Sequence, residues 1–122
     1  HGIVKGLEKK KLFTNAHVFC LPTYYAFFEG QPISIIEAYA SGCVVLATDH
    51  GGIKDIFQDR VNGFEIQKKS SESIRQTLEK IIRNTKQLLP IAISNQKIAL
   101  NKFRVHHYIN FLKDIIEKKE IF

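Results

Sequence analysis

The chain has 122 residues, a size that suits one folded domain able to bury roughly two thirds of its unfolded surface. Its formal charge of +6 comes from 18 basic and 12 acidic residues, but only four of the cations are arginine, whereas nucleic-acid readers typically interleave arginine with aromatics. No apolar run reaches the roughly 20 residues that span a bilayer. We therefore rank a phosphate-bearing substrate or an anionic membrane surface above nucleic acid as the partner.

The start of the chain and its cysteines indicate whether it belongs to a longer protein and in which cellular compartment it is found. His1 is followed at once by strand-like sequence rather than by a charged leader, so we expect that the chain begins inside a longer protein or has lost its start. Cys20 and Cys43 lie in apolar runs, which is typical of small buried side chains in a reducing compartment. We expect a cytoplasmic protein, with a peripheral position at the inner face of a membrane as the alternative.

Strands and helices alternate along the first part of the chain. The run at 44–47 is apolar without alternation, as in parallel strands that helices cover on both faces. Gly42 stands where a left-handed residue would close a helix. This spacing predicts a parallel α/β sheet. The expected elements are a strand at 2–4, a helix at 8–15, a strand at 17–21, a helix at 32–41, a strand at 44–47, a short helix at 53–58, a turn at 62–63 and a strand at 64–66.

From Ser71 onward the apolar pattern is helical throughout. We expect Ser71 to cap the first of these helices, since serine accepts a hydrogen bond from a free backbone N–H at a helix start. Pro90 is expected to begin a second helix that ends near residue 100. The last helix, from Val105 to Ile116, carries an apolar stripe so wide that it needs a surface to cover.

Two carboxylates, Glu29 and Glu37, stand eight positions apart across a Gly-Gln-Pro turn. Pro32 suits the first helical position, because its ring presets φ and its missing N–H would be unpaired there anyway. Glu29 would then lie on the loop before the helix, and Glu37 in the helix's second turn. Free N–H groups at a helix start favour phosphate, while carboxylates accept hydrogen bonds from hydroxyls. The pattern predicts a site for a ligand that carries both groups.

Three further segments accompany this pair in order. They are Leu-Pro-Thr at 21–23, Glu-Ala-Tyr-Ala-Ser-Gly at 37–42 and Ala-Thr-Asp-His-Gly-Gly at 47–52. The E-x7-E pair alone is a weak signal, but together the four segments resemble the nucleotide-sugar half of retaining GT-B glycosyltransferases of the group 1, family 4 type. The resemblance is dense over residues 3–66 and thin beyond. Lys54-Asp55 departs from the Pro-Glu that often follows the Gly-Gly in this family.

This resemblance implies an α/β fold with a partial Rossmann-like parallel sheet and flanking helices, the C-terminal half of a GT-B fold, ending in a helical segment. Residues 1–122 would form one partial domain, with the motifs in 1–69 and the C-terminal helices in 70–122. The family's strand order, 3-2-1-4-5-6, would put the strand at 2–4 at one edge and leave two missing strands between it and the strand at 17–21.

By the same resemblance, Glu29 is the catalytic candidate, which contacts the transferred sugar and stabilises its reacting face. Glu37 would accept the two ribose hydroxyls of the nucleotide. The alternative for each is an exposed surface acid, although the apolar neighbours of Glu37 at positions 33, 36 and 40 predict that it lies near the buried stripe of its helix.

Backbone groups complete the implied site. Donor sugar and phosphate would contact the backbone of Gly30, Gln31, Pro32, Ile33 and Ser34. Because Pro32 has no N–H, the donors among these would be Gln31, Ile33 and Ser34. Thr48, Gly51 and Gly52 follow a strand's carboxyl end, where open parallel sheets bind ligands, so they form a nucleotide-loop candidate. An ordinary turn is the alternative there. The residues of this implied site are Glu29, Gly30, Gln31, Pro32, Ile33, Ser34, Glu37, Thr48, Gly51 and Gly52.

Neither a metal nor another cofactor is implied. His106 and His107 are adjacent, so on a helix they point about 100° apart and cannot readily chelate one ion. We expect one of them to be packed and the other exposed. Enzymes of the resembled type use protein cations and the helix dipole where other transferases use a divalent ion.

The function implied is sugar transfer from a nucleotide-sugar donor to an acceptor hydroxyl with retention, an activity of the EC 2.4 type. In the resembled family an Arg and a Lys from an upstream half-domain neutralise the pyrophosphate, and a separate N-terminal domain binds the acceptor. No position here matches either part, so we expect the isolated chain to be inactive. Two alternatives stay open: a non-catalytic nucleotide-binding or sugar-binding module on the same fold, and a basic α/β interaction domain.

Overall fold

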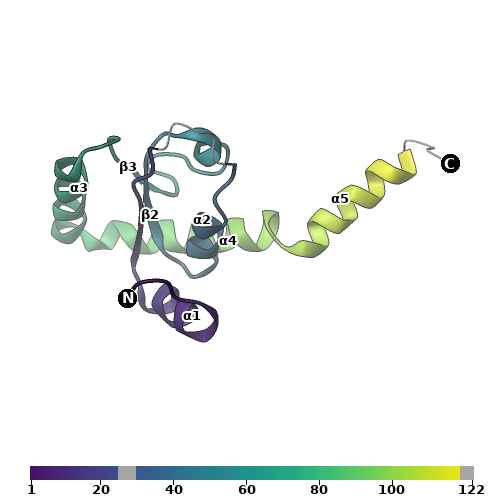
Figure 1. Ribbon diagram of the computed structural model, residues 1–122, viewed down its shortest axis with the longest axis horizontal. Helices are drawn as coiled ribbons and strands as arrows, with labels where there is room; N and C mark the ends of the chain where they lie inside the picture. Colours follow the sequence, from purple (N-terminus) through teal and green to yellow (C-terminus); the bar gives the residue numbers. More distant parts are fainter. Residues whose placement is uncertain (25–29, 119–122) are drawn as a thin grey trace.

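The computed structural model describes residues 1–24 and 30–118. Three strands, β1 (Val18–Leu21), β2 (Val44–Ala47) and β3 (Gly63–Glu65), form a parallel sheet in the order β1-β2-β3 (Figure 1). The remaining elements are α1 (Gly6–Asn15), α2 (Ile33–Ala40), the 3-10 helix η1 (Gly51–Asp55), α3 (Ser71–Arg83), the short 3-10 helix η2 (Thr85–Gln87), α4 (Leu88–Lys102) and α5 (Val105–Lys118). The predicted α/β class, with its partial parallel sheet, flanking helices and helical C-terminal segment, is confirmed.

Both faces of the sheet are covered. On one face, Val45 and Ala47 of β2 pack with Ile35, Ala38 and Tyr39 of α2 and with Ala99 of α4. On the other face, Leu46 packs with Ile66 and with Ile81 of α3. All four residues of β2 are buried, so the prediction that the apolar run at 44–47 is a parallel strand covered on both faces is confirmed.

The end of α2 is set by Gly42. Its φ of 76° is left-handed, as expected, and the N–H groups of Gly42 and Cys43 donate to the carbonyls of Tyr39 and Ala38 at 3.0 and 2.9 Å. These two bonds form a Schellman motif, which satisfies the last carbonyls of the helix and turns the chain directly into β2.

Tyr39 ties α2 to the segment that follows β2. Its side chain is fully buried, and its hydroxyl donates to the carbonyl of Ile56 at 2.8 Å. Burial holds the pKa of this phenol above its usual range. The helix and the chain just after η1 are therefore joined through the core as well as through the sheet.

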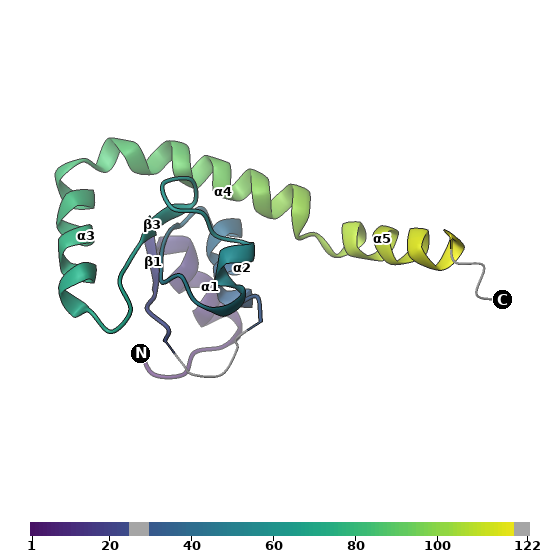
Figure 2. The ribbon, with the colours of Figure 1, turned by 90° about the horizontal axis from the view of Figure 1, so that it is seen from above.

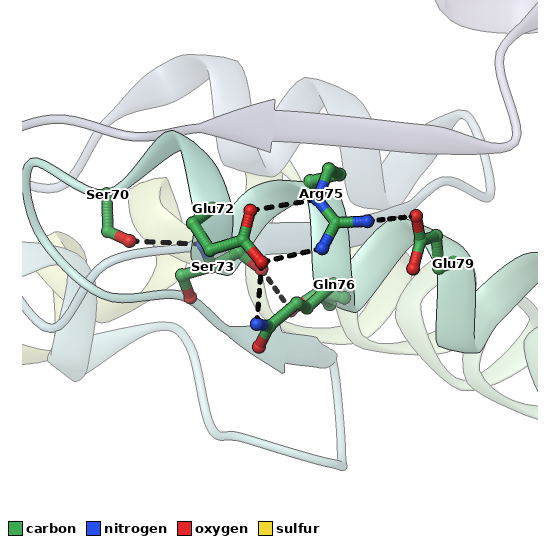
Figure 3. Close-up of polar contacts among 7 residues, drawn as sticks. Ser70, Glu72, Ser73, Arg75, Gln76 and Glu79 are labelled. Carbon is green, nitrogen blue, oxygen red and sulfur yellow. Dashed lines mark hydrogen bonds and ion pairs between the residues drawn. The ribbon is translucent and has the colours of Figure 1, made fainter.

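An all-polar network at the start of α3 fixes where that helix begins (Figure 3). The hydroxyl of Ser70 accepts from the backbone N–H of Ser73 at 3.0 Å, so Ser70 is the cap and the expectation of Ser71 was wrong by one residue. Arg75 then donates to both oxygens of Glu72, at 2.8 and 2.6 Å, and also pairs with Glu79. The charged side chains of Glu72, Arg75 and Glu79 are all about half exposed, on the solvent side of the helix.

The long helix α4 runs along the sheet (Figures 1 and 2). Its Asn95 side chain is fully buried. The amide of Asn95 donates to the carbonyls of Cys43 and Asn62, each at 2.9 Å, and the amide of Asn62 donates back to Asn95 Oδ1 at 3.0 Å. A buried polar network therefore joins α4 to the start of β2 and to the turn before β3. Pro90 is the third residue of α4, so this helix begins two residues earlier than expected.

The last helix, α5, extends away from the sheet and its covering helices in both views (Figures 1 and 2). Its predicted bounds and apolar stripe are confirmed, and the stripe is exposed: Val105 is 73% exposed and Ile109 is 45% exposed. His106 and His107 are both exposed, with ring centroids 4.1 Å apart, so the expectation that one of them is packed was wrong.

Residues 2–4 are not a strand. Gly2 has a left-handed φ of 64° and Ile3 is 92% exposed, so this segment neither extends nor finds a neighbouring strand. Among the described residues, β1 pairs with β2 on one side and with no strand on the other. The expected open edge at β1 is confirmed, whereas the strand predicted at the far side of two missing strands is wrong.

Candidate functional site

The predicted phosphate-binding segment lies at the start of α2, on the surface. Pro32 is the residue before the helix rather than its first residue, with φ of −72° and ψ of 117°, so the helix begins at Ile33. Ile35 N donates to the Pro32 carbonyl at 3.1 Å, which closes the first turn. In the described part of the chain, the N–H groups of Gln31, Ile33 and Ser34 have no hydrogen-bond acceptor. These three donors are therefore available to an anion or a hydroxyl.

The Gly-Gly loop after β2 packs against this same segment. A Cβ added at Gly52 would lie 2.8 Å from the carbonyl carbon of Gly30 and 2.9 Å from the nitrogen of Gln31. Only glycine allows that approach, because the atoms it meets are backbone and cannot rotate away. Gly51 has a left-handed φ of 53°, which turns the chain into η1. The structure thus brings together the two loops that the sequence predicted as one site.

Thr48 has a different surrounding from its neighbours in the predicted nucleotide loop. Its side chain is fully buried, and Thr48 Oγ1 donates to the carbonyl of Thr23 at 2.6 Å. This bond ties the residue after β2 to the chain after β1, at the carboxyl edge of the sheet. Thr48 therefore holds together the loops that follow β1 and β2. A direct contact between Thr48 and a nucleotide stays a prediction.

Two polar atoms at this edge were not singled out by sequence reasoning. Thr23 Oγ1 and His50 Nε2 are both buried, and neither has a hydrogen-bond partner within the residues that the structure describes. Buried polar atoms are normally paired, so both are places where water or a ligand would be accommodated. The signal was present in the motifs, since Thr23 ends the Leu-Pro-Thr segment and His50 precedes the Gly-Gly.

Glu37 lies one turn into α2 and faces α1. Its side chain is 35% exposed, and its Oε1 is 2.6 Å from the Nζ of Lys9. The buried stripe of α2 consists of Ile35, Ala38 and Tyr39, while Ile33 is 71% exposed and Ala40 is exposed as well. Positions 33 and 40 are therefore not part of the buried stripe, contrary to the expectation, whereas Glu37 itself lies beside that stripe and is paired with a cation.

Glu29, the catalytic candidate, lies outside the described residues.

Among the residues that are described, no group of three or more His, Cys, Asp or Glu side chains is arranged to hold a metal ion. Cys20 and Cys43 are free thiols, and burial raises the pKa of both, which disfavours the thiolate. In the same described ranges, no helix combines the length and the apolar character needed to cross a bilayer.

The chain belongs to the glycosyl transferases group 1 family, whose model matches residues 2–98. Its fold is that of the C-terminal, nucleotide-sugar-binding domain of GT-B enzymes. The resemblance carried by the four sequence segments is therefore confirmed.

Particular relatives cover most of this chain but only part of their own length. The amylovoran biosynthesis glycosyltransferase AmsK of Erwinia amylovora is 24% identical over 114 residues, which are 91% of this chain and 28% of AmsK. The C-terminal domain of LpcC, a group 1 family glycosyl transferase from Francisella tularensis, superposes with a TM-score of 0.73 at 26% identity, over 86% of this chain and 52% of that one. Anabaena Alr3699/HepE in complex with UDP superposes with a TM-score of 0.80 at 22% identity, over 88% of this chain and 29% of that one.

Proposed function

We propose that this chain is the donor-binding part of a retaining glycosyltransferase of the EC 2.4 type, which moves a sugar from a nucleotide-sugar to an acceptor hydroxyl. The observation that carries the proposal is the packing of Gly52 on the Gly30–Gln31 peptide, which sets the Gly-Gly loop against the start of α2. Unpaired backbone donors beside that contact suit a phosphate, since they lie at the positive end of a helix dipole. Membership of the group 1 family supports the same assignment.

Different residues would bind different parts of the nucleotide-sugar donor. The N–H groups of Gln31, Ile33 and Ser34 would bind phosphate and sugar oxygens, and Glu37 would accept the ribose hydroxyls. Glu29 would contact the transferred sugar, a role that rests on its place in the sequence motif. Support for a nucleotide-sugar comes from HepE, whose structures were obtained with UDP, with UDP and glucose, and with UDP-glucose.

The remaining parts of such an enzyme would come from outside these 122 residues. The chain spans 28% of AmsK and 29% of HepE. An upstream half-domain would supply the cations for the pyrophosphate, and an N-terminal domain would supply the acceptor site. Alone, the chain would bind its donor weakly and would not turn over. The enzyme would serve polysaccharide or glycolipid biosynthesis, in keeping with the name of the amylovoran biosynthesis glycosyltransferase AmsK, and a cytoplasmic location stays a prediction.

Backbone amide resonances test the donor site directly. We would titrate the isotope-labelled chain with UDP and with UDP-glucose, expecting the largest shifts at Gln31, Ile33, Ser34 and Gly52. Glu37→Ala should weaken UDP binding by about 1.5 to 3 kcal/mol if both ribose bonds are lost. Glu79→Ala on α3 serves as the control, since it removes a carboxylate remote from the site. Shifts that leave these four residues unchanged would favour the basic interaction domain instead.

A second variant separates the two carboxylates. Glu29→Gln should leave UDP affinity nearly unchanged, because the proposed partner of Glu29 is the transferred sugar, which UDP lacks. Loss of UDP affinity in Glu29→Gln would instead assign Glu29 to the nucleotide.

A further inference from the structure

The ion pair between Lys9 and Glu37 joins α1 to the carboxylate assigned to ribose. Lys9 Nζ lies 2.6 Å from Glu37 Oε1, and the two side chains are 40% and 35% exposed. Lys9 is not among the site residues predicted from the sequence. Among the described residues, Lys9 is the one cation that forms an ion pair with a residue of the proposed donor site.

The pair lies in a hollow of ≈ 360 Å³ between the two helices, which is also lined by Gly6, Lys10, Phe13, Ala40 and Ser41. The far end of α1 is fixed on the core, because the thiol of Cys43 contacts the carbonyls of Phe13 and Ala16 at 3.6 and 3.4 Å. Lys9 precedes Phe13 by four residues, so it is on the same face of this anchored helix. Its ammonium is therefore presented to Glu37 by a fixed element.

The chemistry of the pair leaves room for a ligand. A carboxylate has about four acceptor positions and an ammonium has three donors. Lys9 occupies Oε1, which leaves Oε2 free to accept from a hydroxyl. It also restrains the torsions of a glutamate that would otherwise sample several rotamers at a half-exposed position. A ribose hydroxyl would then meet a carboxylate that is already oriented.

We propose that Lys9 is a positioning residue that holds Glu37 for the ribose diol of the donor nucleotide. This inference rests on the proposed function, in which Glu37 binds ribose. If the ion pair were purely structural, its loss would lower the free energy of unfolding only slightly, because half-exposed ion pairs contribute modestly to folding. A role in orienting Glu37 predicts instead a specific loss of discrimination at the ribose.

The test compares UDP with 2′-deoxy-UDP, which lacks one of the hydroxyls. For each protein, amide titration gives the dissociation constant of 2′-deoxy-UDP divided by that of UDP, which measures how strongly the protein discriminates at the ribose. Lys9→Met should lower this ratio by about two- to fivefold, the range expected for losing a half-exposed ion pair. Lys9→Arg should restore it, since a guanidinium also donates to a carboxylate. Lys10→Met, which removes a charge from the same hollow, is the matched control and should leave the ratio unchanged.

The outcomes separate the inference from the function on which it rests. If Glu37→Gln abolishes the discrimination and Lys9→Met keeps it, the positioning role of Lys9 is wrong and the donor site stands. An equal loss of affinity for both nucleotides in Lys9→Met would also overturn it, because that result describes simple attraction to the diphosphate. If Glu37→Gln keeps the discrimination, or if UDP does not bind the wild-type chain, the proposed function falls and the inference falls with it.

Discussion

The amide groups of Asn62 and Asn95 hydrogen-bond to each other inside the molecule, at 3.0 Å, although 33 residues separate them in the chain. Asn95 also donates to two backbone carbonyls, and Asn62 Oδ1 accepts from the N–H of Gln58 at 2.9 Å. One helical side chain thus organises both the turn before β3 and the start of β2. A helix in contact with the sheet only through apolar atoms would not fix that turn.

Asn95→Ala should destabilise the chain by about 2 to 4 kcal/mol. The substitution removes three hydrogen bonds and takes the hydrogen-bond partner from two buried groups, the Cys43 carbonyl and the side-chain amide of Asn62, each at a cost of about 1 to 3 kcal/mol before relaxation. Urea denaturation followed by circular dichroism would measure the change. Lys97→Ala on the same helix, an exposed site, is the control and should change stability by less than about 0.5 kcal/mol. Equal midpoints for the two variants would contradict the network's role.

Gly63→Ala should destabilise the fold by at least about 3 kcal/mol, because it overpacks the sheet itself. A Cβ at this position would lie 1.7 Å from the carbonyl oxygen of Val45, an atom of the adjacent strand that cannot move without breaking the ladder. Gly30→Ala is the matched control, since a Cβ there meets no atom within 4 Å. Thermal unfolding of both variants tests the prediction, and a Gly63→Ala chain as stable as wild type would refute it.

The start of α3 should lose stability in acid through Glu72. Its hydrogen bonds from Arg75, and then from Gln76, hold the pKa of the Glu72 carboxyl below its ordinary value of 4.5. A lowered pKa in the folded state means that the contribution is fully present above 4.5 and is lost as the pH falls through the folded value. Glu72→Gln should therefore flatten the dependence of the unfolding midpoint on pH below 4.5. Glu8→Gln, an exposed acid in the first turn of α1, is the control.

The open edge of β1 should make the chain self-associate. Beside this strand lies an apolar hollow of ≈ 600 Å³, lined by Val18, Val44 and residues of α3 and α4, and its rim includes the exposed side chains of Ile82 and Leu89. An uncovered strand edge with an apolar flank pairs readily with another chain. Sedimentation should show mass rising with concentration, and Leu89→Lys should reduce that rise more than Leu7→Lys on α1 does. A wild-type monomer with reversible, cooperative unfolding would contradict this.

Sequence reasoning succeeded where local chemistry decides the outcome. The apolar run at 44–47, the left-handed Gly42 and the apolar pattern of α5 each follow from the residues themselves, and all three were predicted correctly. The segment at 2–4 was predicted wrongly because a strand exists only beside another strand, and the sequence does not reveal which neighbour is present.

The site was harder to predict than the fold, because its details depend on contacts between distant residues. The Gly-Gln-Pro turn and the Gly-Gly loop were both recognised, but not that Gly52 packs on Gly30. Ile33 was grouped with Ile36 and Ala40 by helical spacing, but it is the first residue of the helix and is exposed, while the buried stripe follows Ile35, Ala38 and Tyr39. The ion pair of Lys9 with Glu37 connects residues 28 positions apart, and no periodicity links them.

Gly52 also constrains how this protein can diverge. Because its Cα faces the Gly30–Gln31 peptide and the phenol of Tyr39 binds the chain just past η1, the two loops have no independent freedom to drift. A lineage that gained a side chain at position 52 would have to rebuild residues 30 and 31 in the same step. Changes in donor preference are therefore expected to arise as paired substitutions in both loops.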